Sequence, residues 1–75
     1  MKPIGELIKE ELKRQERSVS WFARQLCCDR SNVYRIFQKS SIDTSTLVRI
    51  SIILHHNFFE DLARDIIEKK ESQEV

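Results

Sequence analysis

Four polar residues in one short stretch, Arg30, Ser31, Asn32 and Arg35, carry side chains suited to contacts with nucleic acid. Guanidinium groups donate to phosphate oxygens and to acceptor atoms on guanine, while amide and hydroxyl groups hydrogen-bond to base edges. Such contacts need a rigid element that presents these side chains together on one surface.

A helix from about Arg30 to Phe37, capped by Asp29, would provide that element. Its apolar residues recur at three- and four-residue spacing, which predicts one buried face. The remaining side chains, including Tyr34, would then point outward. The predicted buried face consists of Val33, Ile36 and Phe37.

A second short helix, from about Val19 to Leu26, is expected directly before it, with Ser18 as N-cap. Cys27 would form a tight turn between the two helices, and the small Ala23 would allow close backbone approach. Because isolated helices this short are marginal in water, they need a scaffold beneath them. The predicted core residues of the first helix are Phe22, Ala23 and Leu26, with Cys28 and Val33 filling the angle.

The spacing of Ala23, Cys27 and Val33 is what a helix-turn-helix requires. Over about Ile4 to Leu62 the chain resembles a lambda-repressor-like, Xre-type helix-turn-helix domain. The resemblance implies an all-α bundle of five helices and sequence-specific binding of double-stranded DNA. One residue departs from the family pattern, since Cys27 stands where the family has Gly. A non-Gly residue at positive φ costs of order 1 kcal/mol. The matching positions are Phe22-Ala23, Leu26, Val33 and Ile36.

The resemblance, together with the outward-facing pattern, assigns roles to individual residues. Base edges in the major groove would be read by Arg30, Ser31, Asn32 and Arg35. Phosphates would be held by Ser18, Arg24, Tyr34, Lys39, Ser40 and Ser41. The last three of these equally fit a solvated loop. The expected partner is double-stranded DNA bound by a homodimer on a two-fold site, as in transcriptional regulation.

Composition agrees with a small helical domain. The chain has 75 residues and one Gly and one Pro, which favours one domain (residues 1–70, with a polar tail at 71–75) of helices with brief connections. Residues 1–40 hold nine Lys/Arg against five Asp/Glu, whereas residues 41–75 hold four against seven. Positive charge therefore concentrates around the predicted helix-turn-helix, although a chance fluctuation on a solvated surface would look the same.

Three further helices are expected. The first runs from about Pro3 to Gln15, the fourth begins after Asp43 or Thr44, and the fifth spans about Phe58 to Lys70, capped by Asn57. Their predicted core residues are Ile4, Leu7, Ile8 and Leu12, then Leu47, Ile50, Ile53 and Leu54, then Phe58, Leu62 and Ile66.

A second apolar stripe on the last helix is wider than one small core needs. Together with Ile52, it suggests a surface where a second copy or another protein docks. The alternative is that the helix lies deep in a groove and buries both stripes. The stripe consists of Phe59, Ala63 and Ile67.

Other reactive residues suggest structural roles. Cys27 fits a turn and Cys28 a core position, while His55 fits a helix end and His56 an inward position. A zinc site made from the Cys27-Cys28 and His55-His56 pairs is not expected, because these pairs lack the spacing of metal ligands. No catalytic motif appears, so neither an enzyme nor a cofactor is expected. No membrane span or signal peptide appears either, which predicts a cytoplasmic protein.

A protein-interaction module, such as an antitoxin or an adaptor, is the alternative function. Trp21, Ile52 and Phe59 would then form the partner surface. Trp21 lies beside its helix's core stripe, so it is expected either to pack partly against the chain or to contact DNA or a partner.

Overall fold

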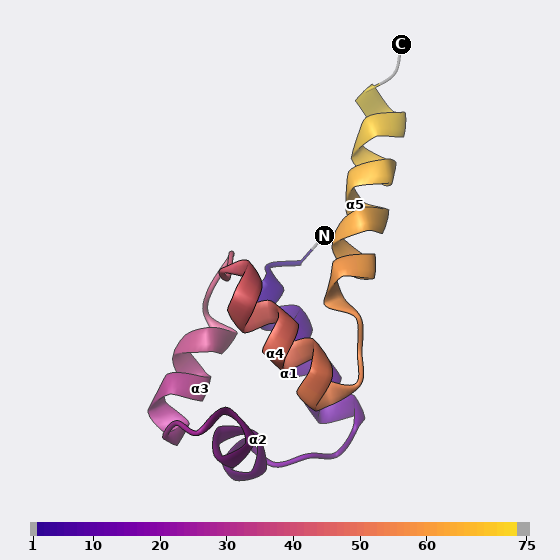
Figure 1. Cartoon of the computed structure of the whole chain (residues 1–75). Coiled ribbons are helices and arrows are strands. Elements are labelled where there is room, and N and C mark those ends of the chain that lie inside the picture. Colours follow the sequence, from indigo (N-terminus) through magenta and orange to yellow (C-terminus); the bar gives the residue numbers. More distant parts are fainter. Residues whose placement is uncertain (1, 74–75) are drawn as a thin grey trace.

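Five helices form the computed structural model of this chain, which describes residues 2–73, with side chains through residue 70 (Figure 1). The described residues contain no strand, so the predicted all-α class is confirmed. The helices are α1 (Ile4–Arg14), α2 (Val19–Leu26), α3 (Arg30–Phe37), α4 (Thr44–Leu54) and α5 (Phe58–Gln73). None of the described helices is both long enough and apolar enough to cross a membrane.

The starts of three helices follow from short polar side chains at their N-caps. Ser18, Asp29 and Asp43 each accept a hydrogen bond from the backbone N–H three residues later, at 3.0, 3.2 and 3.0 Å. Each bond satisfies a donor that the first helical turn leaves without a partner. The predicted caps of α2, α3 and α4 are therefore confirmed, and Asp43 rather than Thr44 caps α4.

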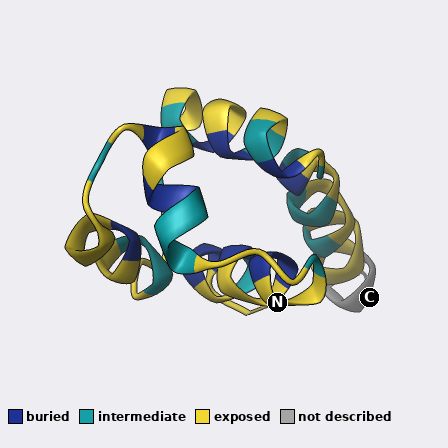
Figure 2. Cartoon of the chain, turned by 90° about the horizontal axis from the view of Figure 1, so that it is seen from below, coloured by how far each residue is buried: buried dark blue, intermediate teal, exposed yellow. Residues whose placement is uncertain are grey.

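The core lies between the helices, and buried segments face the interior of the bundle in Figure 2. Most predicted core positions are buried, but six of them are only partly buried: Leu7, Cys28, Ile36, Phe37, Ile53 and Leu62. Ile66 was predicted to pack on the core and is instead 65% exposed. The buried apolar residues are Ile4, Ile8, Leu12, Phe22, Ala23, Leu26, Val33, Leu47, Ile50, Leu54 and Phe58.

The turn between α2 and α3 is built on Cys27, which adopts left-handed backbone angles of φ 56° and ψ 43°. A residue with a Cβ thus adopts a positive φ at this turn, which carries a strain of about 1 kcal/mol. The next residue, Cys28, donates its backbone N–H to the carbonyl oxygen of Ala23 at 3.0 Å. This bond closes the turn and sends α3 away from the axis of α2.

Close approach between α1 and α3 depends on Gly5. A Cβ added there would lie 2.2 Å from the carbonyl oxygen of Ile36 and 2.6 Å from that of Phe37. The backbone N–H of Gly5 also donates to the carbonyl oxygen of Lys39 at 2.9 Å. Gly5 therefore positions the C-terminal end of α3 and the loop that follows it.

The last helix, α5, projects from the bundle (Figure 1) and is not among the closely packed helix pairs, which are α2 with α3, α1 with α3 and α2 with α4. The molecule measures 47 × 20 × 20 Å along its principal axes. Phe58 is fully buried and Leu62 is partly buried, so only the first part of α5 joins the core. The hypothesis of a helix lying deep in a groove is therefore wrong.

Candidate nucleic-acid interface

The outer face of α3 presents all five side chains that the sequence placed there. Val33 is fully buried beneath them and anchors the helix, whereas the five outward residues are exposed. These exposed residues are Arg30, Ser31, Asn32, Tyr34 and Arg35. The ring of Tyr34 meets that of Phe37 edge-on, with centroids 6.1 Å apart, which steadies the aromatic side chain on the surface.

Three of these residues, Ser31, Asn32 and Arg35, also take part in hydrogen bonds along the first half of α3. The hydroxyl of Ser31 donates to Oδ1 of Asp29 at 2.6 Å, and this bond holds the pKa of the Asp29 carboxyl below its ordinary value. Nη1 of Arg35 donates to Oδ1 of Asn32 at 3.4 Å. The amide oxygen of Asn32 is thus partly occupied, while its NH₂ group keeps both hydrogens for an outside acceptor.

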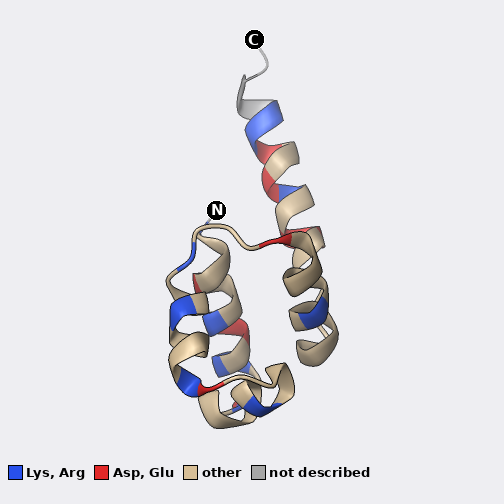
Figure 3. Cartoon of the chain, turned by 60° about the vertical axis from the view of Figure 1, so that its left-hand side comes forward, with Lys and Arg blue, Asp and Glu red and all other residues tan. Residues whose placement is uncertain are grey.

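Exposed cations surround this face. In the part of the chain that the structure describes, Arg24, Arg30 and Lys39 form no ion pair. In contrast, Arg14 on α1 and Arg64 on α5 each pair with a carboxylate. Figure 3 turns α3 forward and shows Lys and Arg segments on α2, on α3 and in the loop after α3, whereas most acidic segments lie on α1 and α5. Cations without carboxylate partners are free to attract phosphates.

The remaining predicted phosphate contacts occupy two places. Ser18 is exposed at the start of α2, and its Oγ already accepts the capping hydrogen bond from Trp21. Lys39, Ser40 and Ser41 are exposed in the loop after α3. That loop is tied to α1 through the carbonyl oxygen of Lys39, so its backbone is anchored while its side chains reach solvent.

Trp21 packs partly against the core rather than standing free on the surface. The guanidinium carbon of Arg17 lies 4.5 Å from the centre of its ring. This cation–π contact covers a face of the indole, which agrees with the interpretation of partial packing.

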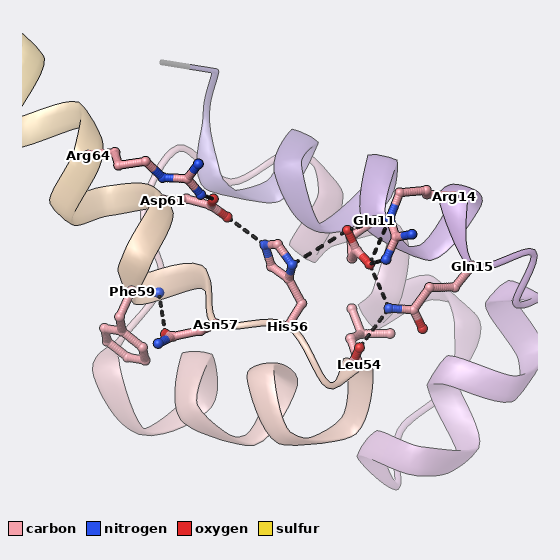
Figure 4. A network of polar contacts seen from close by, with 9 residues as sticks. All are labelled: Glu11, Arg14, Gln15, Leu54, His56, Asn57, Phe59, Asp61 and Arg64. Atoms are coloured by element: carbon pink, nitrogen blue, oxygen red, sulfur yellow. Dashed lines mark hydrogen bonds and ion pairs between the residues drawn. The ribbon is translucent and has the colours of Figure 1, made fainter.

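A polar network between α1 and the start of α5 was missed by the sequence analysis (Figure 4). His56 lies between two carboxylates, with Nε2 2.7 Å from Oδ2 of Asp61 and Nδ1 3.6 Å from Oε1 of Glu11. Gln15 donates to Glu11 and to the carbonyl oxygen of Leu54, both at 2.6 Å. Glu11, His56 and Asp61 line a groove of about 550 Å³, and the contacts of the network attach the connection before α5 to α1.

Glu11 is the centre of that network and is only 8% exposed. The neighbouring Arg14 guanidinium, through its hydrogen bonds, lowers the pKa of the Glu11 carboxyl. The sequence signal was its position, because Glu11 follows Ile4 and Ile8 at helical spacing on the buried side of α1. As predicted, His56 points inward and His55 ends α4. The backbone of His55 adopts a left-handed conformation there. Among the described residues, no group of His, Cys, Asp or Glu could hold a metal ion.

The residues predicted to form a docking surface are divided between two helices. Ile52 on α4 is 66% exposed and Ile67 on α5 is 55% exposed. Ala63 is also exposed, whereas Phe59 is partly buried against the core. The exposed residues of α5 lie on the part of that helix that projects from the bundle.

Comparisons with models of known protein families, with curated proteins and with solved structures gave no match to this chain.

Proposed function

We propose that this protein binds double-stranded DNA in a sequence-specific manner and regulates transcription, with α3 as the recognition helix in the major groove. The observation that carries the proposal is the outer face of α3, where Arg30, Ser31, Asn32 and Arg35 are exposed together above a fully buried Val33. A two-helix unit with a tight turn of this kind suits a recognition helix that docks in the major groove. The proposed fold family is the lambda-repressor-like, Xre-type helix-turn-helix.

The roles within this proposal follow from chemistry and exposure. Arg30 and Arg35 contact guanine O6 and N7, while Ser31 and Asn32 contact neighbouring base edges. The residues around them contact the DNA backbone and set the position of the helix in the groove. These backbone contacts come from Ser18, Arg24, Tyr34, Lys39, Ser40 and Ser41.

Selection of bound duplexes from a random DNA pool tests sequence specificity directly. A single enriched motif supports the proposal, whereas an unchanged pool contradicts it. Binding of the selected duplex is then measured against salt concentration by fluorescence anisotropy. Each phosphate neutralised contributes about 0.9 to the slope of log K against log salt, so two to four cations per protomer predict a slope of about −2 to −4 for each protomer.

Substitution of single cations shows which residues contribute to this salt dependence. Arg24→Ala and Lys39→Ala each reduce its magnitude by about 1, because each removes one phosphate contact. Lys13→Ala is the matched control, since Lys13 is exposed on α1 outside the helix-turn-helix. An equal effect of all three variants would show that net charge rather than this surface governs binding.

A protein-interaction module is the second candidate, favoured by the exposed isoleucines on α4 and α5. Such a module would bind its partner with little dependence on salt. The salt series therefore distinguishes the two functions.

A further inference from the structure

Arg17 is an exposed cation on the connection between α1 and α2, and an aromatic ring holds its guanidinium group. The guanidinium carbon lies 4.5 Å from the centre of the Trp21 ring. A cation–π contact of this kind uses none of the N–H donors of the guanidinium group. Among the described residues, Arg17 forms no ion pair, not even with the adjacent Glu16, and its side chain makes no hydrogen bond. The group is therefore oriented without being neutralised.

Most other arginines outside α3 use their donors within the fold. Arg14 and Arg64 pair with carboxylates, and Arg49 donates to a backbone carbonyl oxygen of α2 at 3.4 Å. Arg17 and Arg24 have no such partner in the described part of the chain. A fixed guanidinium group with unused donors is suited to a phosphate, which offers several acceptor oxygens.

The position of Trp21 on α2 determines where this guanidinium group lies. The buried residues of α2, which are Phe22, Ala23 and Leu26, define its inner side. At about 100° per residue, Trp21 and Arg24 both fall on the opposite side, with Arg24 about 4.5 Å further along the helix axis. Trp21 is only partly buried, which leaves ring surface for the contact with its cation. The two arginines without carboxylate partners therefore follow the same outer side of α2.

We propose that Arg17 is a further phosphate-binding residue of the DNA interface, and that Trp21 is a positioning residue that orients its guanidinium group. This inference rests on the proposed function, because it adds a contact to the same interface. Ser18, the N-cap of α2, directly follows Arg17, so the new contact adjoins one already proposed. The ring reduces the conformational entropy that a long, unrestrained arginine side chain loses on binding.

Anisotropy titrations with the selected duplex over a series of salt concentrations test the role of Arg17. Arg17→Ala should reduce the magnitude of the slope of log K against log salt by about 0.9, because one phosphate contact is lost. It should weaken binding to the selected duplex and to single-base variants by the same factor, because a phosphate contact carries no sequence information. Arg64→Ala is the matched control, since it removes an exposed arginine that already pairs with Asp61, and it should leave the slope unchanged.

Substitution of the ring tests whether Trp21 acts through Arg17. Trp21→Leu should weaken DNA binding about two- to fivefold, as expected for loss of an exposed cation–π contact, while the slope stays unchanged because the charge remains. Trp21→Phe keeps an aromatic face and should restore most of the affinity. In the Arg17→Ala background, Trp21→Leu should have no further effect on binding. Urea denaturation checks that every variant remains folded.

The outcomes separate this inference from the proposed function. A wild-type protein that selects no DNA motif would overturn both. Specific binding by the wild type with an unchanged slope in Arg17→Ala would overturn the phosphate contact alone. Equal weakening by Trp21→Leu with and without Arg17 would overturn the positioning role of the ring, because the two residues would then act independently.

Discussion

Arg30 and Arg35 differ in how freely their guanidinium groups can move to a ligand. Arg35 donates to the amide oxygen of Asn32 at 3.4 Å, which holds both side chains along the face of α3. Arg30 has no side-chain partner within the described residues. The hydrogen bond therefore orients the NH₂ group of Asn32 outward. Because the Arg30 side chain is not held in this way, it loses more conformational entropy on binding.

Replacing either arginine by alanine should relax specificity at one base pair. Arg30→Ala and Arg35→Ala are each expected to lose about 1–3 kcal/mol of discrimination at the guanine they contact. The measurement is binding of the selected duplex and of duplexes with single base changes. Arg35→Ala should also reduce specificity at the neighbouring base, because Asn32 loses the partner that orients it. Unchanged specificity in both variants would contradict the placement of α3 in the groove.

The Asp43 cap predicts a pH dependence of stability. Hydrogen bonds, first from the Ser45 hydroxyl and then from Thr46, lower the pKa of the Asp43 carboxyl from 3.8 to about 2. A carboxyl with a lowered folded-state pKa contributes stability that is present above its unfolded value and is lost as pH falls through the folded value. This contribution is therefore complete above about pH 4 and is lost towards pH 2.

Asp43→Asn keeps a capping side chain but removes the titration. The variant should be less stable than the wild type at pH 7, and the difference should shrink between pH 4 and pH 2. Urea denaturation at a series of pH values measures it. Ser45→Ala retains the carboxyl but removes the hydroxyl that lowers its pKa most, so its stability should fall at a higher pH. A difference between Asp43→Asn and wild type that does not vary with pH would refute the role of the charge.

At the scale of the elements, features set by neighbouring residues could be predicted from the sequence, whereas features set by tertiary contacts could not. The bounds of α2 and α3 match the prediction, because the caps Ser18 and Asp29 and the apolar spacing act within a few residues. The exposure of Ile66 was not predictable from spacing, since it depends on where α5 leaves the bundle. Gly5 was overlooked for the same reason: its importance comes from the backbone of α3, more than 30 residues away in the chain.

Within the candidate site, the sequence predicted which side chains are exposed, but it did not predict which side chains of different helices contact each other. The outward residues of α3 follow from the positions of its apolar residues, so Arg30 and its neighbours could be placed in advance. The contacts of Glu11 with His56 depend on the packing of α1 beside the end of α4. Sequence spacing carries information along one helix, but it does not show which side chains of two distant helices meet.

Gly5→Ala tests how α1 positions α3. Alanine favours a helix over glycine by about 1 kcal/mol, but its Cβ would meet two backbone carbonyls of α3 that cannot rotate away. Overpacking of this kind costs about 1–3 kcal/mol, so a net loss of stability is expected, together with weaker DNA binding. Lys9→Ala on the exposed side of α1 is the control, with a change within about 0.5 kcal/mol. Higher stability of Gly5→Ala in urea denaturation would contradict this close approach.

At the scale of the whole molecule, the charged face and the apolar stripe lie on different elements. The cations surround α3 within the bundle, whereas the stripe lies on α5, which extends away from it (Figures 1 and 3). A second copy can therefore dock on α5 without covering Arg30 or Arg35. Each surface can be altered by substitution while the other is left intact, which allows DNA binding and self-association to be measured separately.

Joining the proposed DNA binding to the expected homodimer predicts how site architecture affects affinity. A dimer related by a two-fold axis should prefer two half-sites on the same face of the duplex, about one helical turn or a multiple of it apart. Its second half-site binds as an intramolecular event, so the wild type should bind the double site far more tightly than a single half-site. Ile66→Ser should lose most of this advantage, because it removes an exposed apolar side chain from α5, where a second copy is expected to dock, while its affinity for a single half-site stays unchanged. Arg30→Ala should instead weaken binding to both duplexes. Anisotropy titrations with the single and double sites distinguish these patterns, and an equal loss on both sites for Ile66→Ser would mean that α5 does not couple the two protomers on DNA.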